Sequence, residues 1–155
     1  MELNTKERQA LENLKSEEQL CIDKFSRYAN EAKDPVLQEL FNTLTKDEQN
    51  HFNSLEQVLN GGPVPAVDCN DSKGKNYAPT ATYAEGTNSA DKTHDSYLAT
   101  DGISTEKLIS GEYNDDVFVF GNSDVRKLFA DIQVEEQNHA EMLYKYKVAN
   151  GMAND

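Results

Sequence analysis

The sequence predicts an all-α fold, a four-helix bundle in which two antiparallel helical hairpins are joined by one long crossover loop. Two pairs of long segments show apolar residues at alternating spacings of three and four, which is typical of bundle helices. A polar segment over residues 60–93 separates the pairs. The pentapeptide Asp47–His51 returns almost unchanged as Glu135–His139, so the second pair repeats the first. With 155 residues, the chain is expected to form a single domain over 1–155.

The first hairpin is predicted to contain helices over residues 5–33 and 35–59. Apolar residues recur with bundle spacing along both segments, from Leu11 onward. Between them, Asp34 is a favourable N-cap and Pro35 suits the first position of a helix. Gly61, followed by a second glycine and a proline, marks the end of the second helix.

The segment 60–93 is predicted to be mostly non-helical and to run along the outside of the bundle. It is rich in Gly, Pro, Ser, Thr, Asn and Asp and lacks sustained periodicity. Two antiparallel hairpins with parallel central helices need one connection along the full length of the bundle. A helix of about 25 residues is about 38 Å long, a distance that about 30 extended residues can span.

The second hairpin is predicted to contain helices over residues 94–119 and 124–150. The first of these is the less regular, because two glycines each cost about 1 kcal/mol relative to alanine in a helix interior. Its last residues, Val117–Phe120, have the composition of a strand. The repeat favours a helix, since this segment has the same place in the second half of the chain as the first predicted helix has in the first half. A turn is expected at Gly121–Ser123, and Gly151 is expected to stop the last helix.

Each half of the chain carries a Glu-x-x-His motif, which places the glutamate and the histidine on one helical face. A further glutamate precedes each motif, and the spacing from Glu18 to Glu48 equals that from Glu106 to Glu136. All of these residues fall where the helical periodicity calls for apolar side chains. The candidate metal ligands are Glu18, Glu48, His51, Glu106, Glu136 and His139.

A single Glu-x-x-His motif on an acidic helix is more often part of a solvated surface. Two copies at core positions are different, because a buried ionised glutamate costs several kcal/mol unless it is compensated. Four carboxylates carry four negative charges, which two divalent ions would neutralise. Carboxylate and imidazole ligands suit iron, manganese or zinc better than calcium. The sequence therefore predicts a site for two metal ions inside the bundle.

Without metal, the clustered carboxylates are expected to repel one another, so that some take up protons and their pKa values rise. Replacing Glu48 and Glu136 with glutamine is therefore expected to abolish metal binding without destabilising the metal-free protein. The sequence assigns no catalytic residue.

Several neighbouring residues receive lesser roles. Asp47 and Glu135 lie one position away from the motif and are expected to reach the site less directly, and Glu17 does not fit the repeat spacing. Tyr28 and Tyr113 are interpreted mainly as core residues. The remaining candidates are Cys21 as a small buried residue, His94 as a surface residue and Cys69 as a loop residue without an assigned role.

Composition excludes several functions. A net charge of −13 and a pI of about 4.6 argue against binding to nucleic acid or to an anionic membrane. No apolar run has the length of a membrane helix, and the polar start is not that of a signal peptide. The two cysteines show no motif spacing, which favours a cytoplasmic protein.

The residues now described resemble the ferritin-like superfamily, in which rubrerythrins use a Glu followed by Glu-x-x-His in each of two hairpins. The segment from Glu18 through Tyr28 to His51 is similar to a rubrerythrin first half. The second half more specifically resembles the Coat F family of spore-forming bacteria. This resemblance is carried by Glu106-Lys107, Tyr113-Asn114, Val125–Leu128, Ile132-Gln133, Glu135–His139 and Asn150–Met152.

The resemblance implies that the six candidate residues bind two metal ions, iron first, with manganese or zinc as alternatives. It implies peroxide or dioxygen reduction, or oxidation of ferrous iron. The alternative is a non-enzymatic spore-coat protein that keeps the bundle for its shape, located in the coat rather than in the cytoplasm, and a storage cage is a third interpretation. Expected partners are metal ions, peroxide or dioxygen, and either a second copy in a homodimer or other coat proteins. The sequence has no Cys-x-x-Cys pair for a rubredoxin-like electron-transfer module.

Overall fold

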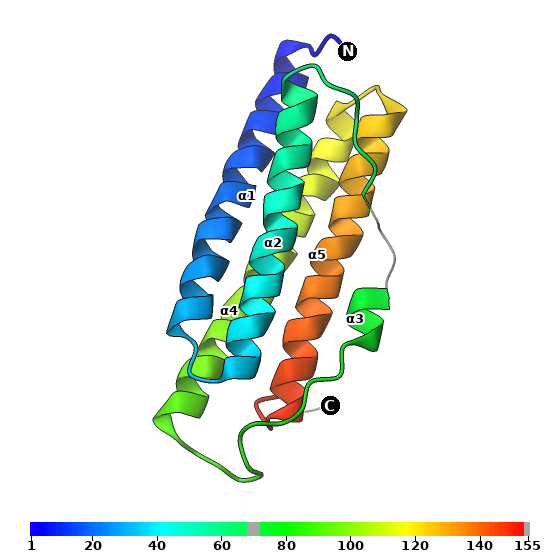
Figure 1. Cartoon of the computed structure of the whole chain (residues 1–155). Helices are drawn as coiled ribbons and strands as arrows, with labels where there is room; N and C mark the ends of the chain where they lie inside the picture. The colour runs from blue at the N-terminus through cyan, green and yellow to red at the C-terminus, as the bar shows by residue number, and fades with distance from the viewer. Residues whose placement is uncertain (68–71, 154–155) are drawn as a thin grey trace.

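The computed structural model describes residues 1–67 and 72–153, and the described part contains helices and no strand. Four long helices form a bundle, which confirms the predicted fold (Figure 1). The elements are α1 (Thr5–Glu31), α2 (Pro35–Leu59), the short helix α3 (Ser72–Asn76), α4 (Ala90–Asp116), the 3₁₀ turn η1 (Val117–Val119) and α5 (Ser123–Ala149).

The bundle consists of two antiparallel hairpins, α1 with α2 and α4 with α5. Each hairpin packs on the other through α1 against α4 and α2 against α5. The crossover starts at the end of the bundle where α2 stops and passes along α5 to the opposite end, where α4 begins (Figure 1). The helices α2 and α4 therefore run parallel, and the long crossover predicted from the composition of residues 60–93 is present.

The helix ends follow from local sequence. Asn4 forms a capping box with Glu7, and its side chain accepts from the backbone N–H of Lys6 and of Glu7. Asp34 caps α2 in front of Pro35, as predicted. The helices α2 and α5 each end before a glycine in the left-handed region, at Gly61 with φ 77° and at Gly151 with φ 65°.

Three boundaries differ by two or more residues from those predicted. The helix α4 begins at Ala90 rather than near His94, because the Ser89 side chain accepts a hydrogen bond of 3.2 Å from the Lys92 N–H and caps the helix earlier. It ends at Asp116, and the two valines and one phenylalanine that follow form η1 instead of a further turn of α-helix. The crossover contains α3, which its composition does not indicate, and α1 stops at Glu31, two residues before its predicted end.

Aromatic rings fill much of the core. Phe25 and Phe41 stack with ring centroids 5.7 Å apart, and Tyr113 meets Phe129 edge-on at 5.5 Å. A Cβ atom at Gly102 would lie 3.3 Å from Phe41 Cε1 and 2.8 Å from a Leu143 methyl carbon. The glycine that looked unfavourable in the sequence therefore gives these side chains room inside the bundle.

Two buried aspartates, Asp34 and Asp95, attach the crossover to the end of the bundle. The backbone N–H groups of Lys33 and Asp34 donate to Asp95 at 2.8 and 2.9 Å, and the Tyr83 hydroxyl donates to it at 2.6 Å. The Tyr146 hydroxyl donates to Asp34 at 2.7 Å. These contacts join the α1–α2 turn, the crossover, α4 and α5, so the buried charges at this end have structural partners.

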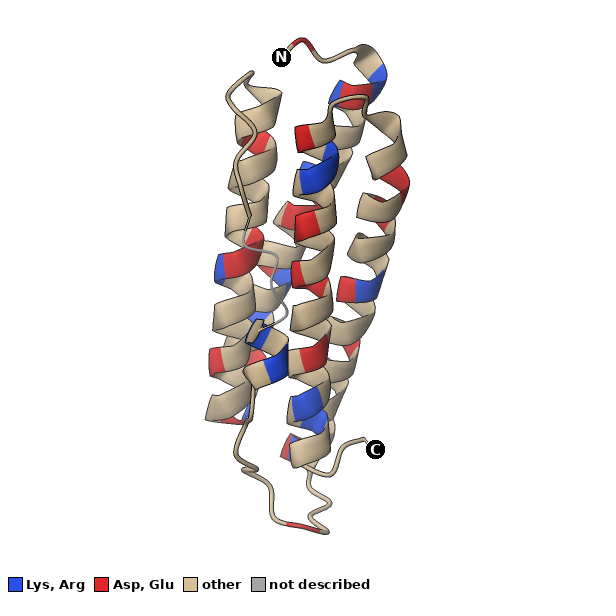
Figure 2. Ribbon diagram, turned by 90° about the vertical axis from the view of Figure 1, so that its right-hand side faces the viewer, with Lys and Arg blue, Asp and Glu red and all other residues tan. Residues whose placement is uncertain are grey.

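The excess of acidic residues is spread along the long helices (Figure 2). Among the described helices, none has the length and apolar character needed to cross a membrane.

Candidate metal centre

The six candidate ligands converge inside the bundle, one each from α1 and α4 and two each from α2 and α5. All six are buried, with no side chain more than 1% exposed. They form two groups, and within each group one ligand atom per residue lies within 4.8 Å of the others. The first group is Glu18, Glu48, His51 and Glu136, and the second is Glu48, Glu106, Glu136 and His139.

Glu48 and Glu136 belong to both groups, so each lies between the two histidines. Glu48 places Oε2 3.3 Å from His51 Nδ1 and Oε1 3.0 Å from His139 Nδ1. Glu136 places Oε1 3.1 Å from His51 Nδ1 and Oε2 3.3 Å from His139 Nδ1. Glu18 and Glu106 each belong to one group. Two shared and four unshared residues are the arrangement that a pair of metal ions requires.

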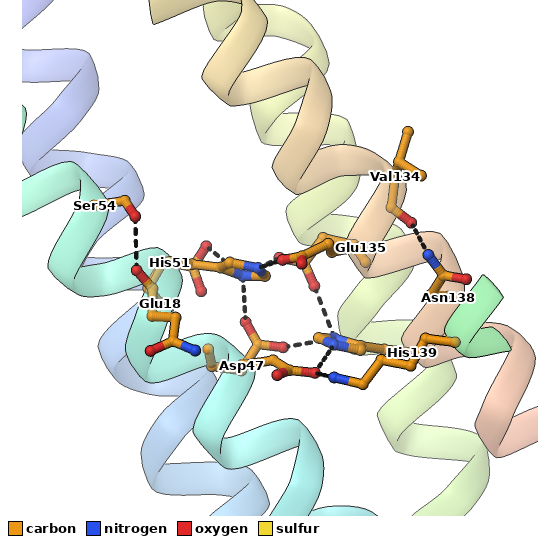
Figure 3. Close-up of polar contacts among 12 residues, drawn as sticks. Glu18, Asp47, His51, Ser54, Val134, Glu135, Asn138 and His139 are labelled. Carbon is orange, nitrogen blue, oxygen red and sulfur yellow. Dashed lines mark hydrogen bonds and ion pairs between the residues drawn. The ribbon is translucent and has the colours of Figure 1, made fainter. Parts of the chain in front are cut away.

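The outer nitrogen of each imidazole contacts a carboxylate from the opposite hairpin (Figure 3). His51 Nε2 forms a short contact with Glu135, and His139 Nε2 lies 3.0 Å from Asp47 Oδ2. Both carboxylates lie closer to the site than the sequence predicts, because spacing along one helix relates each of them only to the histidine of its own helix. The sequence does contain a signal for them, since Asp47 and Glu135 each stand directly before the glutamate of a Glu-x-x-His motif. These contacts fix the ring orientation so that Nδ1 points into the cluster.

The four central glutamates separate into two kinds. Burial and the negative charges of Glu48 and Glu136 raise the pKa of Glu18 well above its usual value, and the same causes raise the pKa of Glu106. Burial also opposes ionisation of Glu48, but hydrogen bonds with His139 and His51 lower its pKa. Burial is likewise outweighed at Glu136, where the interaction with Glu106 and the charge of His51 lower the pKa.

Burial alone would lower the pKa of both histidines, but the surrounding carboxyl groups raise it well above the usual value. In the metal-free site these directions favour imidazolium groups at His51 and His139 that face ionised Glu48 and Glu136, and they favour the protonated forms of Glu18 and Glu106. The predicted rise in carboxyl pKa is thus found for Glu18 and Glu106. The pKa values of the two shared glutamates are lowered instead, because each one contacts both histidines.

The unpartnered oxygens test whether the residues fit a metal. Among the described residues, the buried side-chain atoms that accept no well-formed hydrogen bond are Oε2 of Glu18 and both carboxyl oxygens of Glu106 and Glu136, although three of these oxygens lie 3.1–3.3 Å from a histidine Nδ1. Buried polar atoms are rarely left in this state, because each costs about 1–3 kcal/mol. All of these atoms belong to the two groups, and oxygen with imidazole nitrogen is a ligand set for first-row divalent metals. The cluster therefore fits a di-metal site.

Tyr113 has a polar role besides its place in the core. It is fully buried, and its hydroxyl donates a short hydrogen bond to Glu18 Oε1. The other tyrosine predicted to lie along the core, Tyr28, is only partly buried and donates to Asp101 at 2.7 Å instead. Tyr113 is thus the tyrosine that touches a candidate ligand.

The remaining candidates lie outside the two groups. Cys21 is buried in the core as expected, and burial raises the pKa of its thiol. Glu17 is exposed beside Glu18, and His94 is partly buried in the first turns of α4, away from the cluster. Cys69 lies outside the described residues.

The fold and the site together define a four-helix bundle with a buried cluster of carboxylates and imidazoles that can hold two metal ions. Comparison with protein families assigns this class more closely. The Rubrerythrin family matches residues 11–147, which include all six candidate ligands and every long helix in whole or in large part. The chain therefore belongs to the Rubrerythrin family of the ferritin-like superfamily. Comparisons with curated proteins and with solved structures returned no match. The finer resemblance to the Coat F family stays a prediction.

Proposed function

We propose that the protein is a di-iron carboxylate oxidoreductase that reduces peroxide or dioxygen. The observation that carries this proposal is the pair of four-residue groups that share Glu48 and Glu136 and contain all the unpartnered buried oxygens of the described residues. A purely structural bundle would gain stability from apolar side chains in these positions. Membership of the Rubrerythrin family supports iron as the metal.

In this proposal the six residues hold the metal pair. Glu48 and Glu136 belong to both four-residue groups and would serve both metal positions, while Glu18 with His51 and Glu106 with His139 would complete one position each. When bound, two ferrous ions would supply two electrons, which with two protons reduce peroxide to two waters or dioxygen to peroxide, and an external electron donor would return the iron to the ferrous state. The histidines would hold the metal through Nδ1, and their Nε2–H groups would donate to Glu135 and Asp47.

The protein side chains also handle protons in this proposal. Glu18 and Glu106 carry protons in the metal-free site and must release them when they become ligands, as must the Nδ1 atoms of the two imidazolium groups. The Tyr113 hydroxyl then donates to an ionised Glu18 and orients that carboxylate. The surrounding apolar core excludes bulk water from these groups.

Metal analysis and anaerobic spectroscopy test the proposal together. Protein produced with iron and purified without oxygen is expected to contain two iron ions per chain. Addition of stoichiometric peroxide or dioxygen is expected to change its near-ultraviolet absorbance within one turnover. Glu18→Gln should lower the iron content, whereas Glu17→Gln is a matched control, since Glu17 is the exposed neighbour on the same helix.

The contrary result is protein that holds no metal under these conditions and melts at the same temperature with and without chelator. The alternative role as a non-enzymatic spore-coat protein would then replace the catalytic one. Iron that is bound and oxidised by dioxygen but does not react with peroxide would narrow the activity to ferrous iron oxidation.

A further inference from the structure

The crossover brings a lysine to one side of the metal centre. The helix α3 is held against α5, where the Gly74 N–H donates to Asn138 Oδ1 at 2.9 Å and Lys145 Nζ donates to the Gly74 carbonyl at 2.6 Å. A Cβ atom at position 74 would lie 3.2 Å from Asn138 Cα, so glycine permits this close approach. None of these contacts involves the side chain of Lys73.

Lys73 instead points to the outer carboxylate of one histidine. Its Nζ forms a short ion pair with Asp47 Oδ2, and that oxygen lies 3.0 Å from His139 Nε2. The Lys73 side chain is 45% exposed, whereas Asp47 is 16% exposed. A chain of contacts thus leads from the surface through Asp47 to the imidazole of one four-residue group.

Among the described residues, the corresponding chain of contacts on the other side contains no lysine or arginine. Glu135 takes the place of Asp47 and contacts His51 Nε2. Across residues 1–67 and 72–153, the ion pairs of Glu135 include no lysine or arginine. The duplicated motif therefore has two different electrostatic surroundings.

Building on the proposed di-metal function, we propose that Lys73 is a positioning residue that makes the two metal positions unequal. The position at Glu106 and His139 binds a divalent cation more weakly than the position at Glu18 and His51. A carboxylate that accepts the Nε2–H of a histidine strengthens Nδ1 as a ligand. The Lys73 ammonium offsets the charge of Asp47 and repels an incoming cation, while Glu135 keeps its full effect. Metal ions therefore fill the His51 position first and leave the His139 position first.

Calorimetric titration of the metal-free protein with Co²⁺ tests this order. The wild type is expected to bind two ions in two resolved steps. Lys73→Met should tighten the weaker step by about threefold to tenfold and leave the tighter step unchanged, with the difference shrinking at high salt. Lys73→Arg keeps the charge and should restore the two separate steps. Lys75→Met removes an exposed charge from the same helix and should match the wild type.

Histidine variants assign the steps to positions. His139→Ala should remove the weaker step, and His51→Ala should remove the tighter one. Two equal steps in the wild type, or a Lys73→Met titration that matches the wild type, would overturn the role of Lys73 while leaving the di-metal function in place. A wild-type chain that binds no Co²⁺, Fe²⁺ or Mn²⁺ would overturn both.

Discussion

In the first hairpin, Glu18 receives a hydrogen bond from the Tyr113 hydroxyl, while in the second hairpin both oxygens of Glu106 lack a hydrogen-bond partner among the described residues. The residue of the first hairpin that corresponds to Tyr113 is Phe25, which has no hydroxyl. Lys73 adds a second difference, because it pairs with Asp47. The repeat thus preserves the ligands, and the residues around them make the two positions different.

A second comparison, between shared and unshared glutamates, gives the largest expected effect. The sequence alone predicts that the double variant Glu48→Gln/Glu136→Gln leaves the metal-free protein stable, but the lowered pKa values of these two glutamates reverse that expectation. The double variant should lose metal binding and destabilise the metal-free bundle by about 3–5 kcal/mol, because it leaves two buried imidazolium groups without ionised partners. The double variant Glu18→Gln/Glu106→Gln should leave the metal-free protein as stable as the wild type at pH 7, since these carboxyls are already protonated. Chemical denaturation in the presence of chelator measures both, and equal stabilities for the two double variants would contradict this division.

The pH dependence of stability should have opposite signs with and without metal. The pKa values of Glu18, Glu106 and the two histidines are raised in the folded state. The stabilisation that these groups give the folded protein is therefore complete at a pH below their unfolded-state pKa values. It is lost as the pH rises toward their folded-state pKa values. Metal-free protein should therefore lose about 1.4 kcal/mol per pH unit for each retained proton between pH 5 and 8. Metal-loaded protein should gain stability over this range, because binding releases those protons. Denaturant titrations at several pH values decide the sign, and parallel curves would count against the proposed protonation states.

The outer carboxylates offer a test of each position separately. Asp47→Asn should weaken metal binding at the His139 position by about tenfold to a hundredfold, and Glu135→Gln should do the same at the His51 position. Titration with Co²⁺ should show each variant altering a different binding step. If both variants alter the same step, the two outer contacts do not serve separate positions.

The smallest effect is expected for the tyrosine that distinguishes the hairpins. Tyr113→Phe removes the donor to buried Glu18 and should destabilise the metal-free protein by about 1–2 kcal/mol. Tyr28→Phe is the matched control, because its hydroxyl bonds to the partly exposed Asp101, and it should cost less than about 1 kcal/mol. Thermal unfolding of the two variants gives the comparison, and a larger loss for Tyr28→Phe would show that the Tyr113 hydroxyl is not important for stability.

Sequence reasoning predicted the features that depend on local periodicity and repetition. The cap at Asp34, the stops at Gly61 and Gly151 and the burial of all six candidate ligands could be predicted because each depends on local sequence and on spacing within a helix. The start of α4 was missed because a single serine cap outweighs weak periodicity. The helix α3 was missed because five residues are too few to show a pattern.

By itself, the sequence determined that two hairpins would bury two equivalent sets of candidate ligands, because acidic and histidine side chains at apolar positions must be compensated by one another or by metal. Only the tertiary structure decided which carboxylates are protonated, which residues hold the outer nitrogens of the histidines, and on which side the crossover places a lysine. Those features depend on distances between side chains of different helices, and spacing along one helix carries no information about them. The contacts of Asp47 with His139 and of Glu135 with His51 are the clearest case, since each residue lies closer in sequence to the other histidine.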